Sequence, residues 1–108
     1  MKVLWTAFAE SQLEGIYDYI QVKNQQAAAD IYNDILDESA MLARFPRLAP
    51  IEPLLSEFPE AYRSLVVRRN YKVVYYIENE TIVYVVSVFD CRQAPQKLKD
   101  NINIRDKN

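Results

Sequence analysis

The sequence predicts an α+β fold with the element order β-α-α-β-β-β, in which an N-terminal helical hairpin covers one face of an antiparallel sheet, and three observations lead to that prediction. Two long segments before residue 46 repeat their apolar residues at helical spacing. Three short segments after residue 60 are rich in Val, Ile and Tyr and are separated by turn-forming residues. The chain has 108 residues, and half of them are apolar, which is enough for a single packed core. It contains one glycine, which favours regular elements over loops.

The first strand is expected at Met1–Trp5, and Thr6 is a suitable N-cap for a helix that follows it. This helix shows one apolar face with i, i+3, i+4 and i+7 spacing, made by Leu13, Ile16, Tyr17 and Ile20. Asn24-Gln25 then forms a short connection to a second helix, which Pro46 ends after about twenty residues. Two helices joined by so short a turn are expected to pack as an antiparallel hairpin.

Residues 46–60 contain four of the five prolines and are expected to form a stiff, irregular loop. The turns after it are expected at 68–70 and 78–80, so that three strands form an antiparallel meander. The predicted strands are Ala61–Val67, Tyr71–Ile77 and Thr81–Phe89.

The last of these strands is apolar on both faces, and only one face can rest on the helical hairpin. The other must be covered by the chain's own tail, by a second subunit or by another protein. Residues 96–108 are polar and are expected to form a flexible tail, as a frayed helix or coil. The predicted organisation is therefore one domain over residues 1–95 followed by this tail.

Composition excludes several kinds of chemistry. The chain has no histidine and one cysteine, Cys91, so a Ser-His-Asp or Cys-His mechanism is excluded and neither a metal site nor a cofactor is expected. Any catalysis must rest on Arg, Lys, Tyr or carboxylates. The N-terminus does not resemble a signal peptide and no segment is long enough to span a membrane, which predicts a cytoplasmic protein.

Charge is distributed unevenly along the chain, although the net charge is only -2. Residues 1–60 carry four basic and ten acidic side chains, whereas residues 61–108 carry nine and five. This asymmetry indicates either an acidic outer face with a basic working face, or two ordinary solvated surfaces of opposite sign.

Four segments, in this order and spacing, resemble the RelE/ParE superfamily of toxins from type II toxin–antitoxin systems, which includes plasmid-stabilisation proteins. The resemblance extends from residue 1 to about residue 95. The segments are Gly15–Ile20 in the first helix, Tyr62–Val67 with its arginine, the hairpin that Tyr71–Ile77 begins, and the closing motif Val88–Pro95.

The resemblance implies a bacterial toxin that inhibits growth unless a cognate antitoxin neutralises it. Two targets stay open. A RelE-like toxin would be an endoribonuclease that cuts mRNA on the ribosome, and a ParE-like toxin would be a non-catalytic poison of DNA gyrase. A third reading is an inactive or repurposed member that only binds its antitoxin. DNA is expected as a partner only indirectly, through the antitoxin complex.

In RNA-cleaving members a basic cluster holds the scissile phosphate, and the matching residues are Arg63 and Arg92. Either arginine could instead pair with a local carboxylate, such as Glu60 or Asp90, and hold a strand end. Further binding candidates are Arg68 and Arg69 in a predicted turn and Tyr62, which could stack on a base or serve only in packing. Many ribonucleases of the family carry a histidine or tyrosine just after the last strand, where this chain has Gln93, Ala94 and Pro95.

Overall fold

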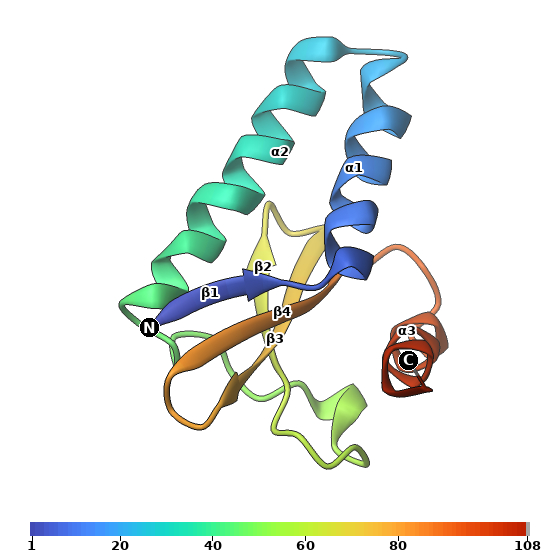
Figure 1. Cartoon of the computed structure of the whole chain (residues 1–108). Coiled ribbons are helices and arrows are strands. Elements are labelled where there is room, and N and C mark those ends of the chain that lie inside the picture. The colour runs from blue at the N-terminus through green and yellow to red at the C-terminus, as the bar shows by residue number, and fades with distance from the viewer. Residues whose placement is uncertain (108) are drawn as a thin grey trace.

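The computed structural model describes residues 1–107, with side chains for residues 1–103, and it confirms the predicted α+β order (Figure 1). An additional helix, α3, follows the last strand. No helix in the described part of the chain has both the length and the apolar character needed to cross a membrane. The elements are β1 (Lys2–Trp5), α1 (Ala7–Gln21), α2 (Gln25–Ala40), β2 (Arg63–Val67), β3 (Tyr71–Glu78), β4 (Ile82–Asp90) and α3 (Gln96–Lys107), with short 3-10 turns at Met41–Ala43 and Pro53–Leu55.

The four strands form one sheet in the order β1-β4-β3-β2. As predicted, β2, β3 and β4 form an antiparallel meander. The sheet as a whole is mixed and not antiparallel as predicted, because β1 pairs with β4 in parallel, with Trp5 opposite Val85. Both helices and two further strands lie between β1 and β4 in the chain, so no tight turn forces this pair to be antiparallel.

The helical hairpin forms where the caps and the apolar spacing place it. The Thr6 hydroxyl accepts a hydrogen bond from the Ala9 N–H at 3.1 Å, and the Asn24 side chain accepts one from the Ala27 N–H at 3.0 Å. Both residues therefore satisfy N–H groups that have no partner within the helix. Helix α2 is shorter than predicted, because it ends at Ala40 and not at Pro46. A 3-10 turn, Met41–Ala43, follows it directly.

One core lies between the hairpin and the sheet. The hairpin supplies Ala9, Leu13 and Ile35, and strands β2, β3 and β4 supply the side chains that point to the same face. Alternation along β4 is interrupted by a register shift opposite Val74 and Tyr75, so Val88 follows Val85 in the core. Figure 1 shows that the far half of the hairpin extends beyond the sheet. The sheet residues of this core are Val67, Tyr71, Val73, Tyr75, Val83, Val85 and Val88.

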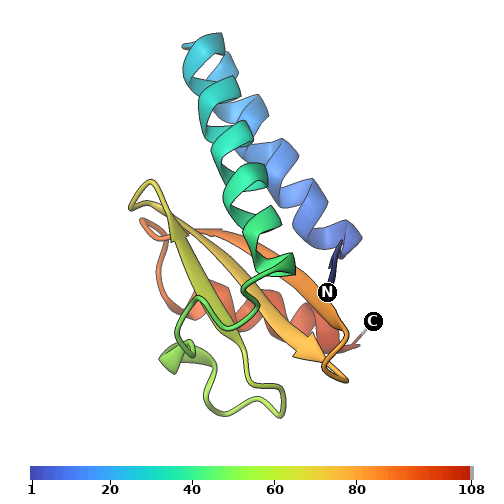
Figure 2. The same cartoon turned by 90° about the vertical axis from the view of Figure 1, so that its left-hand side faces the viewer.

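A second core lies on the opposite face of the sheet, under the C-terminal helix α3 and the 3-10 turn Pro53–Leu55. Leu98 and Ile102 of α3 are fully buried in one cluster with Val86 and Phe89 of β4. Figure 2 shows α3 lying along the sheet, away from the hairpin. The segment expected as a polar flexible tail is thus a helix over Gln96–Lys107, and its buried Leu98 and Ile102, four residues apart, pack on the second face.

Candidate functional site

An open groove of about 330 Å³ lies between α1 and the ends of β3 and β4. It forms because β1 pairs only with the first half of β4, so the second half of β4 faces a helix instead of a strand. Gln12 of α1 takes over part of the pairing, since its side-chain oxygen accepts from the Val88 N–H at 2.9 Å and from the Ser87 hydroxyl at 3.0 Å. The groove is lined by Gln12, Gly15, Ile16, Tyr19, Ile20, Tyr71, Val88, Asp90, Arg92 and Gln93.

Arg92 lies at the rim of this groove and is held in a defined orientation. Its guanidinium donates to both carboxylate oxygens of Asp90, from Nε at 2.9 Å and from Nη2 at 2.8 Å. Nη2 also donates to the Tyr71 hydroxyl at 3.2 Å, and the guanidinium carbon lies 5.8 Å from the centre of the Tyr71 ring. The side chain remains 61% exposed, so it is accessible to a partner.

The same contacts set the protonation of this pair. The hydrogen bond from Arg92 lowers the pKa of Asp90 against a smaller opposing effect of burial. The Asp90 carboxylate in turn raises the pKa of Arg92. Both groups are therefore charged at neutral pH, and the ion pair persists into the acid range.

Arg63 does not lie near Arg92. Arg63 lies opposite Tyr75 on β3, whereas Arg92 contacts Tyr71 on the same strand. Tyr71 and Tyr75 are four residues apart, so their Cα atoms are separated by about 13 Å along the strand. The Arg63 guanidinium donates to the carbonyl of Ala49 at 2.8 Å. Arg63 thus anchors the proline-rich loop to the sheet through a backbone oxygen.

Tyr62 is a core residue. Its side chain is 1% exposed, its ring meets those of Phe58 and Tyr76 edge-on, and its hydroxyl donates to Glu60 at 3.3 Å. A base could stack on this ring only if the second core opened. The structure therefore gives Tyr62 a packing role.

Arg68 and Arg69 lie at the same end of the sheet as Arg92, because the Cys91 N–H donates to the Asn70 carbonyl at 2.7 Å and joins the two segments. Arg68 forms an ion pair with Asp34 of α2 at 2.7 Å. The Arg69 side chain is exposed. Of the predicted residues, Arg68, Arg69 and Arg92 share one end of the molecule, while Arg63 and Tyr62 do not join them.

The ion pair between Glu52 and Lys72 was not predicted from the sequence. Glu52, 2% exposed, binds Lys72 and also accepts from the Ser64 hydroxyl at 2.9 Å and from the Leu54 N–H at 3.0 Å. Burial acts to raise the pKa of Glu52, but these hydrogen bonds and the Lys72 charge outweigh it, so the pKa is lowered. The available signal was Lys72, the one charge inside the apolar run Tyr71–Ile77.

The described residues contain no group of three His, Cys, Asp or Glu side chains placed to hold a metal ion. Burial raises the pKa of the Cys91 thiol, which disfavours a reactive thiolate at neutral pH. The arrangement around the groove provides a charged, aromatic and partly apolar binding surface.

Comparison with known proteins shows which family the sequence matches and which solved structure shares the fold. A family model described as the ParE toxin of the type II toxin–antitoxin system parDE matches residues 3–95. A solved structure, described as the chromosomal ParDE TA system from P. aeruginosa, matches with a TM-score of 0.68 and 22% sequence identity. That match covers 83% of this chain and 95% of the other. No curated protein matches the chain.

Proposed function

The chain belongs to the family of ParE toxins of type II toxin–antitoxin systems, and from this premise we propose that it inhibits growth by binding DNA gyrase. A cognate antitoxin holds it inactive. On this proposal the protein is an inhibitory binding module with no catalysis of its own, acting in the bacterial cytoplasm, where its target lies.

The observation that carries this proposal is the separation of the two arginines matched to the ribonuclease motif. Cleavage of RNA without histidine would need several cations around one phosphate, to stabilise the charge that develops there. Arg63 instead donates a hydrogen bond to the Ala49 carbonyl, and the Arg92 guanidinium donates two hydrogen bonds to the Asp90 carboxylate. The arrangement therefore favours binding over phosphodiester cleavage.

The groove beside Arg92 is the contact surface that we assign to the target. Arg and Tyr are the residue types most often found where an interface gains most of its binding energy. Arg92 lies on the rim, and Tyr19, 78% exposed, lies on the α1 side. A partner segment in the groove would meet both, together with the apolar Ile16, Ile20 and Val88.

Cleavage of mRNA on the ribosome is the second candidate. It is favoured by the common position of Arg68, Arg69 and Arg92 at one end of the sheet, where an RNA backbone could contact all three. In that case Arg92 would be a phosphate contact. A member that only binds its antitoxin is the third candidate.

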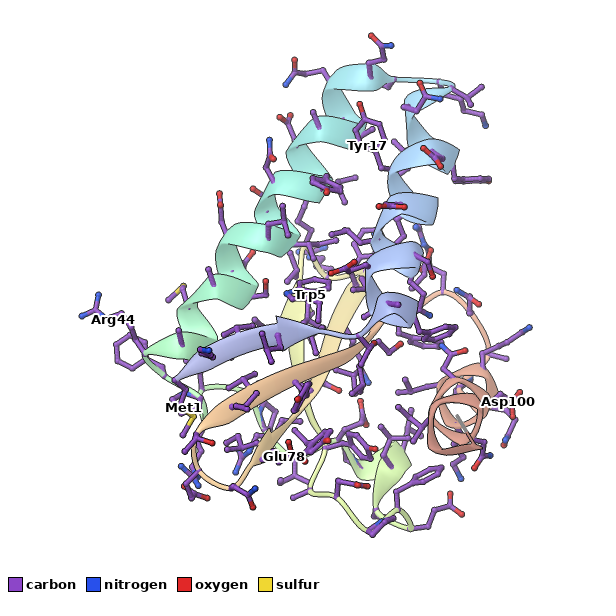
Figure 3. The ribbon with its side chains drawn as sticks, in the orientation of Figure 1. Met1, Trp5, Tyr17, Arg44, Glu78 and Asp100 are labelled. Carbon is purple, nitrogen blue, oxygen red and sulfur yellow. The ribbon has the colours of Figure 1, made fainter. Side chains whose placement is uncertain are left out.

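Supercoiling of relaxed plasmid by purified gyrase, with the toxin released from its antitoxin, tests the proposal. The wild type is expected to inhibit, and Arg92→Ala to need about tenfold more protein, the loss typical of one strong interface residue. Arg44→Ala is the matched control, since Arg44 is an exposed arginine that follows α2 near Met1 (Figure 3).

The same preparations are added to a bacterial translation extract. Cuts in mRNA that require ribosomes, with gyrase unaffected, would replace the gyrase proposal by the ribonuclease. If folded protein affects neither reaction and yet binds its antitoxin, the third candidate holds.

A further inference from the structure

A second, smaller cavity of about 260 Å³ lies at the base of the hairpin, apart from the groove beside Arg92. It is lined by Trp5 of β1, by Glu10, Leu13 and Glu14 of α1, and by Tyr32 and Leu36 of α2. Figure 3 shows Trp5 between the two helices, where the hairpin meets β1. The cavity is below the size of sites that enclose drug-sized ligands, and it suits one long side chain.

The walls of this cavity are aromatic and held in place. The Tyr32 ring meets the ring of Tyr17 edge-on, with centroids 5.7 Å apart and an interplanar angle of 78°. Trp5 is fixed by its strand, which pairs with β4 opposite Val85. The faces of Trp and Tyr rings attract cations, and their apolar surface also accepts a methylene chain.

The rim carries two negative charges that no Lys or Arg among the described residues pairs with. Glu10 and Glu14 are four residues apart on α1, so they occupy one helix face, where two like charges repel. Both side chains are exposed, and among the described residues neither forms an ion pair with Lys or Arg. A cation placed between them would relieve the repulsion.

We propose that this cavity binds a basic side chain, arginine or lysine, presented by a protein partner. The charged group lies between Glu10 and Glu14, and the methylene stem rests on Trp5 and Tyr32. Leu36, 37% exposed at the edge, accepts a neighbouring apolar side chain of the same partner segment. The proposal deepens the proposed function, which supplies the antitoxin as the partner, and it predicts that the antitoxin segment here carries a positive charge.

Charge complementarity decides between this occupant and others. Residues 1–60, which include every lining residue, carry ten acidic and only four basic side chains. A second copy of this chain that docked symmetrically through the same face would bring like charge to the cavity, and an acidic segment would also be repelled. A basic segment is attracted, and the apolar walls then hold its stem.

The test uses the whole chain, labelled with ¹⁵N, because Trp5 is the only tryptophan and its indole N–H gives a single resonance in the cavity wall. The probe is N-acetyl-arginine methylamide, and the comparison is the citrulline analogue, which has the same shape without the charge. We expect a saturable shift of the indole resonance in the millimolar range with arginine and a much weaker one with citrulline.

Two double variants complete the test. Glu10→Gln/Glu14→Gln is expected to weaken binding about fivefold or more, as the loss of two exposed ion pairs would. Asp18→Asn/Asp37→Asn removes the same amount of charge from the helical hairpin, at exposed residues outside the cavity, and it should leave binding close to wild type. The dispersion of the spectrum reports whether each variant is folded, and the single variant Glu14→Gln gives a milder form of the same test.

The proposal is overturned if arginine produces no saturable shift, if citrulline binds equally well, or if the control variant loses as much as the cavity variant. Equal binding of citrulline would indicate an apolar occupant. Growth inhibition is measured separately with the wild type. If the protein binds the probe but does not inhibit growth, the cavity proposal stands and the proposed toxin function is wrong. If it inhibits growth but does not bind the probe, the proposed function stands and the cavity proposal is wrong.

Discussion

The carboxylate of Asp90 holds the guanidinium of Arg92 through two hydrogen bonds, of 2.9 Å and 2.8 Å, although the residues are only two apart in the chain. The Asp90 carboxylate also accepts from the Arg92 backbone N–H at 2.9 Å. Because these contacts are local, they need only the end of β4 to be in place. They fix Arg92, on the rim of the groove, in one orientation.

Asp90→Asn tests whether this orientation matters. The variant keeps the Arg92 charge but replaces the ionic contact by a weaker one, so growth inhibition is expected to fall less than in Arg92→Ala. The stability change should be about 1 kcal/mol or less, because the Arg92 side chain is 61% exposed and solvent screens the ion pair. Growth of expressing cells and urea unfolding give the two readouts. Full toxicity in Asp90→Asn alongside loss in Arg92→Ala would show that the ion pair does not position the arginine.

Glu52→Gln should be the most destabilising single-charge removal in the chain. It leaves the partly buried Lys72 ammonium without its counter-charge, and breaking a buried pair in this way costs about 3 kcal/mol. Equilibrium unfolding in urea measures the change. Glu57→Gln is the control, since the Glu57–Lys99 pair has a 62% exposed carboxylate and should cost under about 1 kcal/mol. Similar losses in the two variants would contradict the central role of Glu52.

Acid should destabilise the fold partly through the same carboxylate. The pKa of Glu52 is lowered in the folded state, so its contribution to stability is complete above the ordinary glutamate pKa of about 4.3. It is lost as pH falls through the lowered folded value. Urea midpoints from about pH 7 to about pH 3 should therefore decline most steeply below about pH 4. Glu52→Gln should flatten that decline, and an unchanged slope would argue against this assignment.

Helix α3 should be required for stability. Ile102→Ala removes a fully buried side chain from the second core and is expected to cost about 3 kcal/mol, as large-to-small core substitutions do. Asn103→Ala, at an exposed position of the same helix, should cost under about 0.5 kcal/mol. Thermal unfolding distinguishes them. If both variants melt like the wild type, α3 does not cover the sheet in solution.

The turn between β3 and β4 offers a stabilising substitution. Asn79 and Glu80 adopt positive φ values of 51° and 59°, and a non-glycine residue in this region costs about 1 kcal/mol. Glu80→Gly creates Asn-Gly, the preferred pair for this turn. It also removes the exposed Arg47–Glu80 ion pair, which contributes little. Unfolding should show stability equal to wild type or up to about 1 kcal/mol higher, and Arg47→Ala measures the ion pair alone. A clear loss in Glu80→Gly beyond that of Arg47→Ala would contradict this view of the turn.

Local chemistry explains how much of the fold could be predicted. Thr6 and Asn24 cap the helices that follow them, and apolar spacing depends only on the period of a helix or strand, so the order of elements could be predicted from the residues. The parallel pairing of β1 with β4 could not be predicted in this way, because the pairing of strands far apart in the chain depends on how the whole hairpin packs.

The candidate site divides in the same way. Arg92 was found because the family motif at the end of the last strand marks it, and its partner Asp90 lies within the same motif. Arg63 was also matched to a family motif, yet its guanidinium donates to the carbonyl of Ala49, which is fourteen residues away in the chain. Sequence alone carried no information on that contact, nor on the ten residues that converge to line the groove.

By itself the sequence determined the element order, the absence of histidine chemistry, the resemblance to toxins and the need to cover two apolar faces of the last strand. Only the tertiary structure decided that α3 covers the second face, that Arg63 and Arg92 lie apart, and that Glu52 meets Lys72 inside the protein. The physical reason is range. Caps, turns and periodicity act over a few residues, whereas burial and ion pairing depend on which distant segments the packed core brings together.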